Sequence, residues 1–212
     1  MNQINIIDKI QLTDKGLVVR GTKQEAHLRQ GQLDGACAVY SMMMCLIIEK
    51  IIRRSQVTNV TKELKRNTAD GRLVRHFLEN RGMIIGGYVF QKLRDELQTA
   101  FSKKVIPHYY DIDEVDDLIK EMFTCLNDNH PIEIGFDYKG GKSGHAVVAI
   151  GYQSALNSIT LYCLDPSYPM EQGQLWNNTL EIVQTSRAKY NCYNLRDNTH
   201  TFVDGFLMFE KR

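Results

Sequence analysis

This 212-residue sequence has no CxxC cysteine pair, no large excess of positive or negative charge and no long apolar run. It also contains few prolines. The five cysteines are odd in number and scattered without a CxxC pair, a pattern typical of neither a disulfide framework nor a zinc knuckle. The formal net charge of +1 argues against a dedicated nucleic-acid binder. No apolar run approaches the roughly 18 residues of a membrane span. We therefore expect a globular protein that partners neither nucleic acid nor a membrane.

We identify no export signal at the start of the chain, because the first nine residues alternate polar and apolar types. We therefore expect a cytoplasmic location, where a reducing environment keeps cysteines as thiols. The sequence shows no internal repeat and no linker, so we predict a single domain over residues 1–212. Within it we expect an extended lead (1–28), a mainly helical half (29–130) and a mainly β half (131–212).

The order of the predicted elements indicates the fold class. Helices are predicted at 36–53, 60–67, 71–81, 91–101 and 115–127, and the first is apolar nearly all round, as buried helices are. Strands rich in β-branched and aromatic residues are predicted at 132–138, 145–153, 158–164, 179–185 and 201–209. Helices followed by strands predict an α+β fold. In it, a helical N-terminal half that includes the buried helix packs on a C-terminal antiparallel sheet.

Cys37 lies where a polar, glycine-containing loop meets the buried helix of 36–53. A helix N-terminus presents unpaired N–H groups and the positive end of the helix dipole, both of which favour a thiolate. The same N–H groups can stabilise the oxyanion that forms when a sulfur attacks a carbonyl. Cys37 is therefore the candidate nucleophile.

His145 and Asp165 supply the other two parts of a cysteine hydrolase site. His145 begins an apolar strand after a Gly-rich loop, where a sheet can hold a general base in place. The next strand ends at Asp165, 20 residues later (165 − 145), so a hairpin would bring both residues to the same end. A carboxylate there can accept the imidazole Nδ1–H and stabilise the imidazolium. Cys37, His145 and Asp165 then form a nucleophile, a base and an orienting group.

These residues resemble the papain-like superfamily, and more specifically the C39-type peptidases and their relatives. The resemblance rests on a glutamine before Cys37, on Gly144-His145-Ala-Val-Val-Ala-Ile-Gly-Tyr and on Asp165-Pro166. It implies a papain-like fold in which the helix of Cys37 packs on the sheet. It also implies cleavage of a peptide or amide bond in a peptide or protein substrate, with no metal or cofactor required.

The glutamine that would help to hold the oxyanion is displaced from its usual position. Family members usually carry it six residues before the cysteine, where this chain has Gly31. Gln30 and Gln32 flank that position, and we favour Gln30 because Gln30-Gly31 resembles the Gln-Gly pair of papain-type enzymes. Gln32 stays the alternative. Ala38 follows the cysteine where glycine is common, which is a minor departure.

Three alternatives remain open from the sequence. The segment Asp34-Gly35-Ala36-Cys37 also resembles the Asp-Gly-x-Cys signature of OTU-type deubiquitinases, although the hairpin from His145 to Asp165 fits the papain and C39 arrangement better. The same triad can deamidate glutamine or transfer acyl groups to amines. The chain could also be a catalytically inactive peptide-binding module. The sequence does not specify the substrate or the oligomeric state.

Overall fold

The computed structural model describes residues 3–30, 36–58, 68–79, 89–114, 117–138, 144–155, 158–183 and 191–212. The helices in these ranges are α1 (Cys37–Ile48), α2 (Arg54–Thr58), α3 (Ala69–Glu79), α4 (Phe90–Phe101) and α5 (Leu118–Asn127). The first five strands are β1 (Asn5–Ile6), β2 (Ile10–Thr13), β3 (Gly16–Val19), β4 (Val105–Asp111) and β5 (Ile132–Tyr138). The others are β6 (Gly144–Ala155), β7 (Ser158–Leu164), β8 (Asn178–Val183), β9 (Asn191–Asn194) and β10 (Thr199–Lys211).

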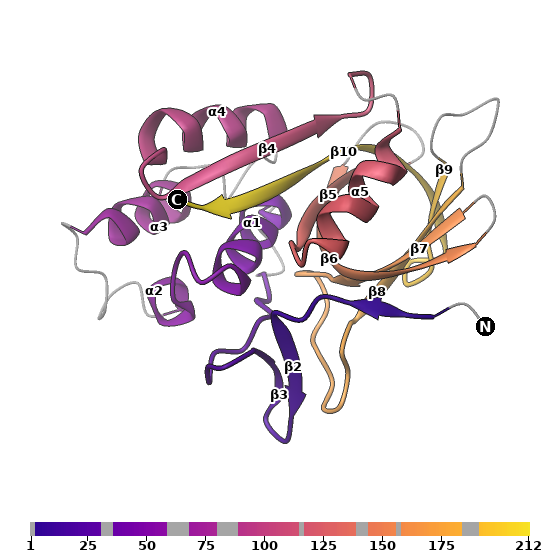
Figure 1. Cartoon of the computed structure of the whole chain (residues 1–212), viewed down its shortest axis with the longest axis horizontal. Helices are drawn as coiled ribbons and strands as arrows, with labels where there is room; N and C mark the ends of the chain where they lie inside the picture. The colour runs from indigo at the N-terminus through magenta and orange to yellow at the C-terminus, as the bar shows by residue number, and fades with distance from the viewer. Residues whose placement is uncertain are drawn as a thin grey trace.

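Six of the described strands close into an antiparallel barrel in the order β6-β5-β10-β9-β8-β7. The ring closes because β7 pairs with β8 on one side and with β6 on the other. Outside the ring, β1 pairs with β6 and β4 pairs with β10. In Figure 1 the barrel lies on the right and helices α1, α2 and α3 lie on the left.

The predicted fold class was wrong. The described chain is mostly sheet and its core is a closed barrel, whereas we expected a helical N-terminal half packed on a sheet. Closure requires strands that bend, and β6 and β10 bend at register shifts between Ala149 and Gly151 and between Val203 and Gly205. A Cβ at Gly205 would lie 2.5 Å from the Tyr110 carbonyl oxygen, so glycine is required at that bend. Hydropathy alternation carries no signal of such bends.

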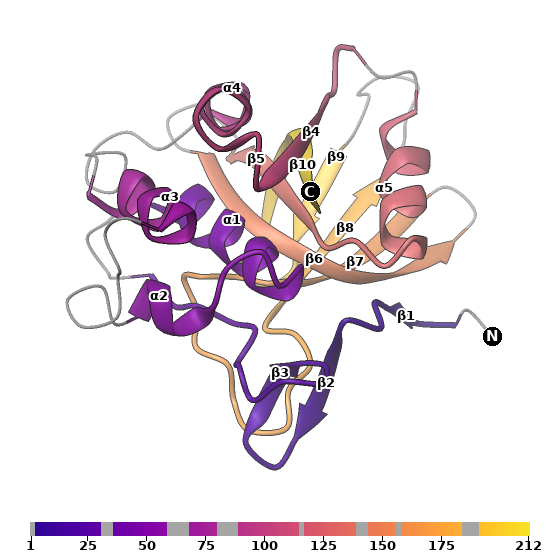
Figure 2. The same ribbon diagram turned by 60° about the vertical axis from the view of Figure 1, so that its left-hand side comes forward.

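The predicted buried helix is present as α1, but it is shorter than expected. Its last seven residues, Met42 to Ile48, have no exposed surface, and it packs against β5 and β6. It ends early because Lys50 adopts a left-handed φ of 56°, and the Ile51 N–H then donates back to the Leu46 carbonyl at 2.9 Å. Figure 2 shows α1 alongside β6, with α2 and α3 on its far side.

The other predicted elements within the described residues are present with shifted ends, and some observed strands were not predicted. The helices predicted at 71–81, 91–101 and 115–127 correspond to α3, α4 and α5, and 60–67 lies outside the described residues. The five predicted strands correspond to β5, β6, β7, β8 and β10. We missed β4 and β9. In β4, Pro107 interrupts the strand pattern, and it is tolerated because β4 adds to the outside of the ring through β10.

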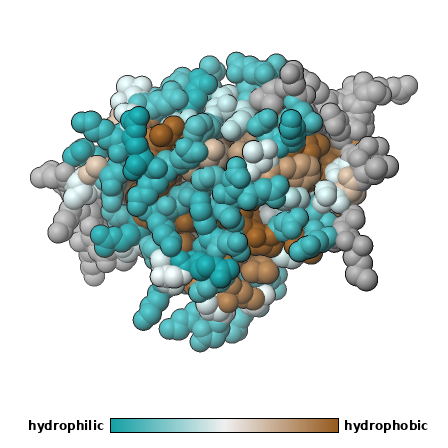
Figure 3. Space-filling model, viewed as in Figure 1, coloured by the Kyte–Doolittle hydropathy of each residue, from teal (hydrophilic) through white to brown (hydrophobic). Residues whose placement is uncertain are grey.

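On the face in Figure 3, hydrophilic residues cover most of the area and hydrophobic residues form separate patches. None of the described helices is both long enough and apolar enough to cross a membrane.

Candidate active site

Cys37 is the first residue of α1. The residue before it, Ala36, makes no side-chain hydrogen bond to the N–H groups of the first turn. Cys37 is partly exposed, whereas Cys45, Cys125, Cys163 and Cys192 are buried. Burial raises the pKa of each of these four thiols, to about 11 for Cys125 and Cys192. Cys37 is thus the cysteine most accessible to a substrate.

His145 connects Cys37 to Asp165. Its Nε2 lies 2.9 Å from Asp165 Oδ1, and Cys37 is close enough to influence the pKa of the ring. Asp165 therefore contacts Nε2, and not Nδ1 as the sequence-based prediction had it. Burial lowers the pKa of His145, but the bonds and charges of Asp165 and Cys37 outweigh it and raise the pKa to about 10. The imidazolium is therefore favoured at neutral pH.

Asp165 follows β7 and has no exposed surface, yet its carboxylate accepts hydrogen bonds at both oxygens. Oδ1 also accepts from the Ser167 N–H at 2.8 Å, and Oδ2 accepts from Asn178 Nδ2 at 2.8 Å. Burial raises the pKa of Asp165, but His145 and these donors outweigh it and lower the pKa below its usual value. Asp165 is therefore a buried carboxylate that carries charge.

A second layer of polar residues holds the backbone of Asp165. Asn177 accepts from the Asp165 N–H at 2.7 Å and donates to its carbonyl at 2.9 Å. His27 Nε2 lies 2.9 Å from the same carbonyl, and burial lowers the pKa of His27, so a neutral ring donates this bond. His27 was not predicted, because it does not lie at the start of an apolar strand as His145 does. The Asn177-Asn178 pair just before a predicted strand was a signal that we did not use.

Gln30 lies against the turn that follows Asp165. Its N–H donates to the Pro166 carbonyl at 2.9 Å, and its Nε2 donates to Ser167 Oγ at 2.9 Å. Its Oε1 is buried and has no hydrogen-bond partner among the described residues. Gln32, the alternative oxyanion residue, lies outside the described residues. The structure thus brings Cys37, His145 and Asp165 together and attaches Gln30 to the same turn.

Glu133 on β5 is a buried acid that the sequence did not single out. It has no exposed surface, and neither carboxyl oxygen has a hydrogen-bond partner among the described residues. Burial raises the pKa of Glu133 well above its usual value, and the nearby Cys37 adds to the effect. Burial therefore favours the neutral form of Glu133, which lies beneath the helix that begins at Cys37.

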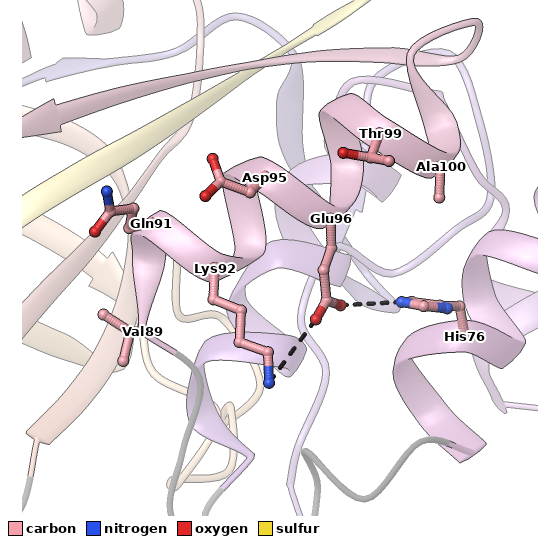
Figure 4. Close-up of a pocket in the computed structure, with 8 residues that line it drawn as sticks. All are labelled: His76, Val89, Gln91, Lys92, Asp95, Glu96, Thr99 and Ala100. Atoms are coloured by element: carbon pink, nitrogen blue, oxygen red, sulfur yellow. Dashed lines mark hydrogen bonds and ion pairs between the residues drawn. The ribbon is translucent and has the colours of Figure 1, made fainter.

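A pocket of about 580 Å³ between α3 and α4 does not contain these residues. In Figure 4, Glu96 of α4 points toward His76 of α3, and their side chains form an ion pair at 2.9 Å. Lys92 also approaches Glu96, at 3.9 Å. No cysteine lines this pocket, so its residues do not support thiol chemistry.

A second pocket, of about 450 Å³, borders the site. His27 lines it, together with Arg29, Arg54 and Met170. Because His27 also contacts the Asp165 carbonyl, the pocket adjoins the back of the catalytic turn. It has a volume typical of ligand pockets.

The comparisons with known proteins agree with this arrangement at the level of a family. The sequence pattern of the Peptidase_C39 like family matches residues 17–197, which include Gln30, Cys37, His145 and Asp165. No curated protein gives a significant match to the chain.

Proposed function

Since the chain belongs to the peptidase C39-like family, we propose that it is a cysteine peptidase that uses Cys37, His145 and Asp165. The observation that supports this most is the 2.9 Å contact between His145 and the buried Asp165, with Cys37 close enough to influence the pKa of the imidazole. An imidazolium held by a charged carboxylate on one side and placed beside the sulfur of Cys37 on the other suits nucleophilic catalysis.

The chemistry proceeds in two stages. His145 holds the proton of the Cys37 thiol as an imidazolium, and the Cys37 thiolate attacks the carbonyl carbon of a peptide bond in a peptide or protein substrate. His145 then gives the proton to the leaving amine as the C–N bond breaks, which leaves a thioester. Water, deprotonated by His145, attacks this thioester, and the C–S bond breaks to release the acid and restore the thiol.

The oxyanion of each tetrahedral intermediate needs hydrogen-bond donors. We assign the Cys37 N–H and the Gln30 side-chain amide to this role, with Gln32 as the alternative. The position of Cys37 at the start of α1, where Ala36 makes no side-chain cap, supports the first donor. The bond from Gln30 to Ser167 supports the second, because it holds the Gln30 side chain against the turn of Asp165.

The location that we propose is the cytoplasm. All five cysteines are free, as expected for a protein that works among reducing thiols. This location and the peptide substrate are independent proposals, because a papain-like site can work in either redox environment.

Selective alkylation tests the nucleophile without knowledge of the substrate. We expect an iodoacetamide probe at pH about 6 to label Cys37 at least tenfold faster than the other four cysteines, by an order-of-magnitude argument from thiolate fractions. His145→Ala should remove this selectivity. The matched control is His130→Ala, because His130 forms a similar 2.9 Å pair with Glu49 away from the site. Equal, slow labelling of all five cysteines would instead favour an inactive peptide-binding module.

Mass spectrometry of peptide libraries tests the reaction. We expect cleaved peptides with the wild-type protein and none with Cys37→Ala. A gain of about one dalton at glutamine would indicate deamidation, and a cross-link would indicate acyl transfer. If either of these products formed without cleavage, the peptidase assignment would be wrong, but the assignment of Cys37 as the nucleophile would stand.

A further inference from the structure

Asp197, in the turn between β9 and β10, binds two tyrosines from different parts of the chain. Tyr138, the last residue of β5, donates its hydroxyl to Oδ2 at 3.0 Å. Tyr168, from the turn after β7, donates its hydroxyl to Oδ1. The carboxylate therefore joins three segments that are far apart in the sequence.

Tyr168 belongs to the turn that carries Asp165. Its carbonyl accepts from Asn177 Nδ2 at 2.9 Å, and the same Asn177 amide donates to the Asp165 carbonyl at 2.9 Å. Within this turn the Ser167 N–H reaches the Asp165 carboxylate. A change in the position of Tyr168 would therefore move the groups that orient Asp165.

Tyr138 belongs to the strand that packs against the His145 ring. Two residues before it, Phe136 meets His145 edge to face with the ring centroids 5.5 Å apart. The Tyr138 ring in turn meets Phe136 at 5.8 Å. The end of β5 thus holds the imidazole through aromatic contacts, whereas the turn of Asp165 holds it through a hydrogen bond.

Asp197 is itself fixed. The fully buried Asn194 donates its Nδ2 to Asp197 Oδ2 at 2.9 Å and accepts from the Asp197 N–H at 3.2 Å. The Arg196 guanidinium lies 4.7 Å above the Tyr168 ring and adds a cation–π contact. The bond to Asp197 and burial raise the pKa of Tyr168 to about 12, so this phenol remains a donor at neutral pH.

We propose that Asp197 is a positioning residue of the active site, which fixes His145 by tying the turn of Asp165 to the end of β5. This inference rests on the proposed function. Asp197 touches neither the substrate nor the reacting atoms. It acts on the imidazole through Tyr168 and Asp165 on one side and through Tyr138 and Phe136 on the other.

Three substitutions test this role: Asp197→Asn, Tyr138→Phe and Tyr168→Phe. An asparagine has one acceptor oxygen and no charge, so the two tyrosine hydroxyls can no longer donate to two separate carboxylate oxygens, and each phenylalanine removes a single donor. Tyr109→Phe is the matched control, because Tyr109 on β4 donates to Asp111 at 3.0 Å, another phenol–carboxylate bond outside this cluster. Thermal melts establish that each variant is folded, and the two tyrosine variants serve if Asp197→Asn is not.

The readouts are the NMR titration of His145 and the pH profile of Cys37 alkylation. We expect the three variants to lower the pKa of His145 and to reduce the alkylation rate and kcat about tenfold with little change in KM, since small misplacements of catalytic groups are costly. Tyr109→Phe should change none of these. If the His145 pKa, the alkylation rate and kcat of all three variants equalled those of Tyr109→Phe, the proposed role of Asp197 would be wrong.

The two readouts separate this inference from the proposed function. If the His145 pKa shifts as expected but wild-type Cys37 shows no selective alkylation, the nucleophile fails and the positioning role stands. If wild-type Cys37 is selectively alkylated and the three variants leave both readouts unchanged, the positioning role fails and the nucleophile stands.

Discussion

Asp165 and Glu133 both have carboxyl groups without exposed surface, but their hydrogen-bond partners differ and their pKa values shift in opposite directions. Asp165 accepts hydrogen bonds from His145, Ser167 and Asn178. Glu133 has no hydrogen-bond partner among the described residues. The pKa of Asp165 is lowered by its partners, whereas burial raises the pKa of Glu133 well above its usual value. Partners, and not burial alone, therefore decide which of the two carries charge.

The different charge states of Asp165 and Glu133 suit the proposed chemistry. A charged Asp165 supports an imidazolium at His145, and so supports proton transfer to and from Cys37. A charged Glu133 would oppose a thiolate at Cys37, because both groups would be negative. The site thus combines a carboxylate that is kept charged beside the proposed base with a carboxyl that is kept neutral near the proposed nucleophile.

The largest effect is expected from Asp165→Asn, which removes the charge and keeps the shape. The pKa of His145 should fall from about 10 toward its ordinary range, because the carboxylate no longer supports the imidazolium. We expect kcat/KM to fall by about 10²- to 10⁴-fold, as when the aspartate of a catalytic triad is replaced. Hydrolysis kinetics and the NMR titration of His145 check this.

The same substitution should remove stability in a defined pH window. The pKa of Asp165 is lowered in the folded state, so its contribution is present above the unfolded pKa of about 3.9 and is lost as the pH falls through its folded pKa. The pKa of His145 is raised, so its contribution is full below about 6.5 and is lost as the pH rises through about 10. The loss should be on the order of 3–5 kcal/mol between pH about 4 and 6.5, as for a broken buried pair. A loss that is independent of pH would contradict a charged Asp165.

Asp165 could be predicted from the sequence, whereas Glu133 could not. The apolar strand after His145 and the strand that ends at Asp165 predict a hairpin, and the pairing of β6 with β7 confirms it. In Ile132–Tyr138, Glu133, Gly135 and Asp137 alternate with apolar residues and resemble a solvent-facing side. Helices cover that side, since Phe90 of α4 lies 3.0 Å from where a Cβ on Gly135 would be. Which helix covers which strand is a tertiary property that alternation does not encode.

The limits of the fold prediction have the same physical origin. The 3.6-residue periodicity located α3, α4 and α5, and β-branched composition located β5 to β8 and β10. Barrel closure depends on the bends in β6 and β10, which arise from pairing with distant strands. The supporting residues of the site, His27, Ser167 and Asn178, likewise come from segments whose proximity only the folded chain reveals. The sequence thus predicted Cys37, His145 and Asp165, which the folded chain brings together, but not the residues that hold Asp165 in place.

A smaller effect, of opposite sign, is expected from Glu133→Gln. Folded Glu133 keeps its proton while the unfolded chain releases it, so wild-type stability falls as the pH rises from about 4.3 toward the folded pKa. Glutamine cannot ionise, so relative to the wild type the variant should gain about 1.4 kcal/mol for each pH unit in that range. Urea unfolding at pH 4, 6 and 8 should show an advantage that grows with pH.

Glu49→Gln is the matched control for Glu133. Glu49 is also largely buried, with a side chain 6% exposed, but it pairs with Lys9 at 2.6 Å and with His130 at 2.9 Å. Its substitution should therefore destabilise the protein. If both glutamine variants were destabilising by similar amounts, Glu133 would have a partner that stabilises its charge, and the contrast with Asp165 would fail.

Asn178→Ala should weaken the hydrogen bonding of the Asp165 carboxylate without removing the carboxylate. The substitution deletes the donor to Oδ2 and leaves the bonds of Oδ1 with His145 and Ser167 in place. We expect a loss of about 1.5 kcal/mol, typical of a hydrogen bond to a charged group. The pKa of Asp165 should rise, so acid unfolding should begin at a higher pH. Asn127→Ala is the control, because it removes a 2.7 Å hydrogen bond from the Tyr152 hydroxyl that lies away from Asp165. It should not change the pH at which acid unfolding begins.

The smallest effect is expected from Ser167→Ala, because only one of the two bonds of Ser167 uses its side chain. The N–H that supports Asp165 remains, whereas Gln30 Nε2 loses the Ser167 Oγ that it binds at 2.9 Å. Alkylation of Cys37 forms no oxyanion, so its rate and pH profile should not change. Peptide cleavage should slow about fivefold, equivalent to about 1 kcal/mol, because the proposed oxyanion donor is less well held. An altered alkylation profile would show that the Ser167 hydroxyl acts on Asp165 as well, and cleavage at the wild-type rate would remove Gln30 from the oxyanion site in favour of Gln32.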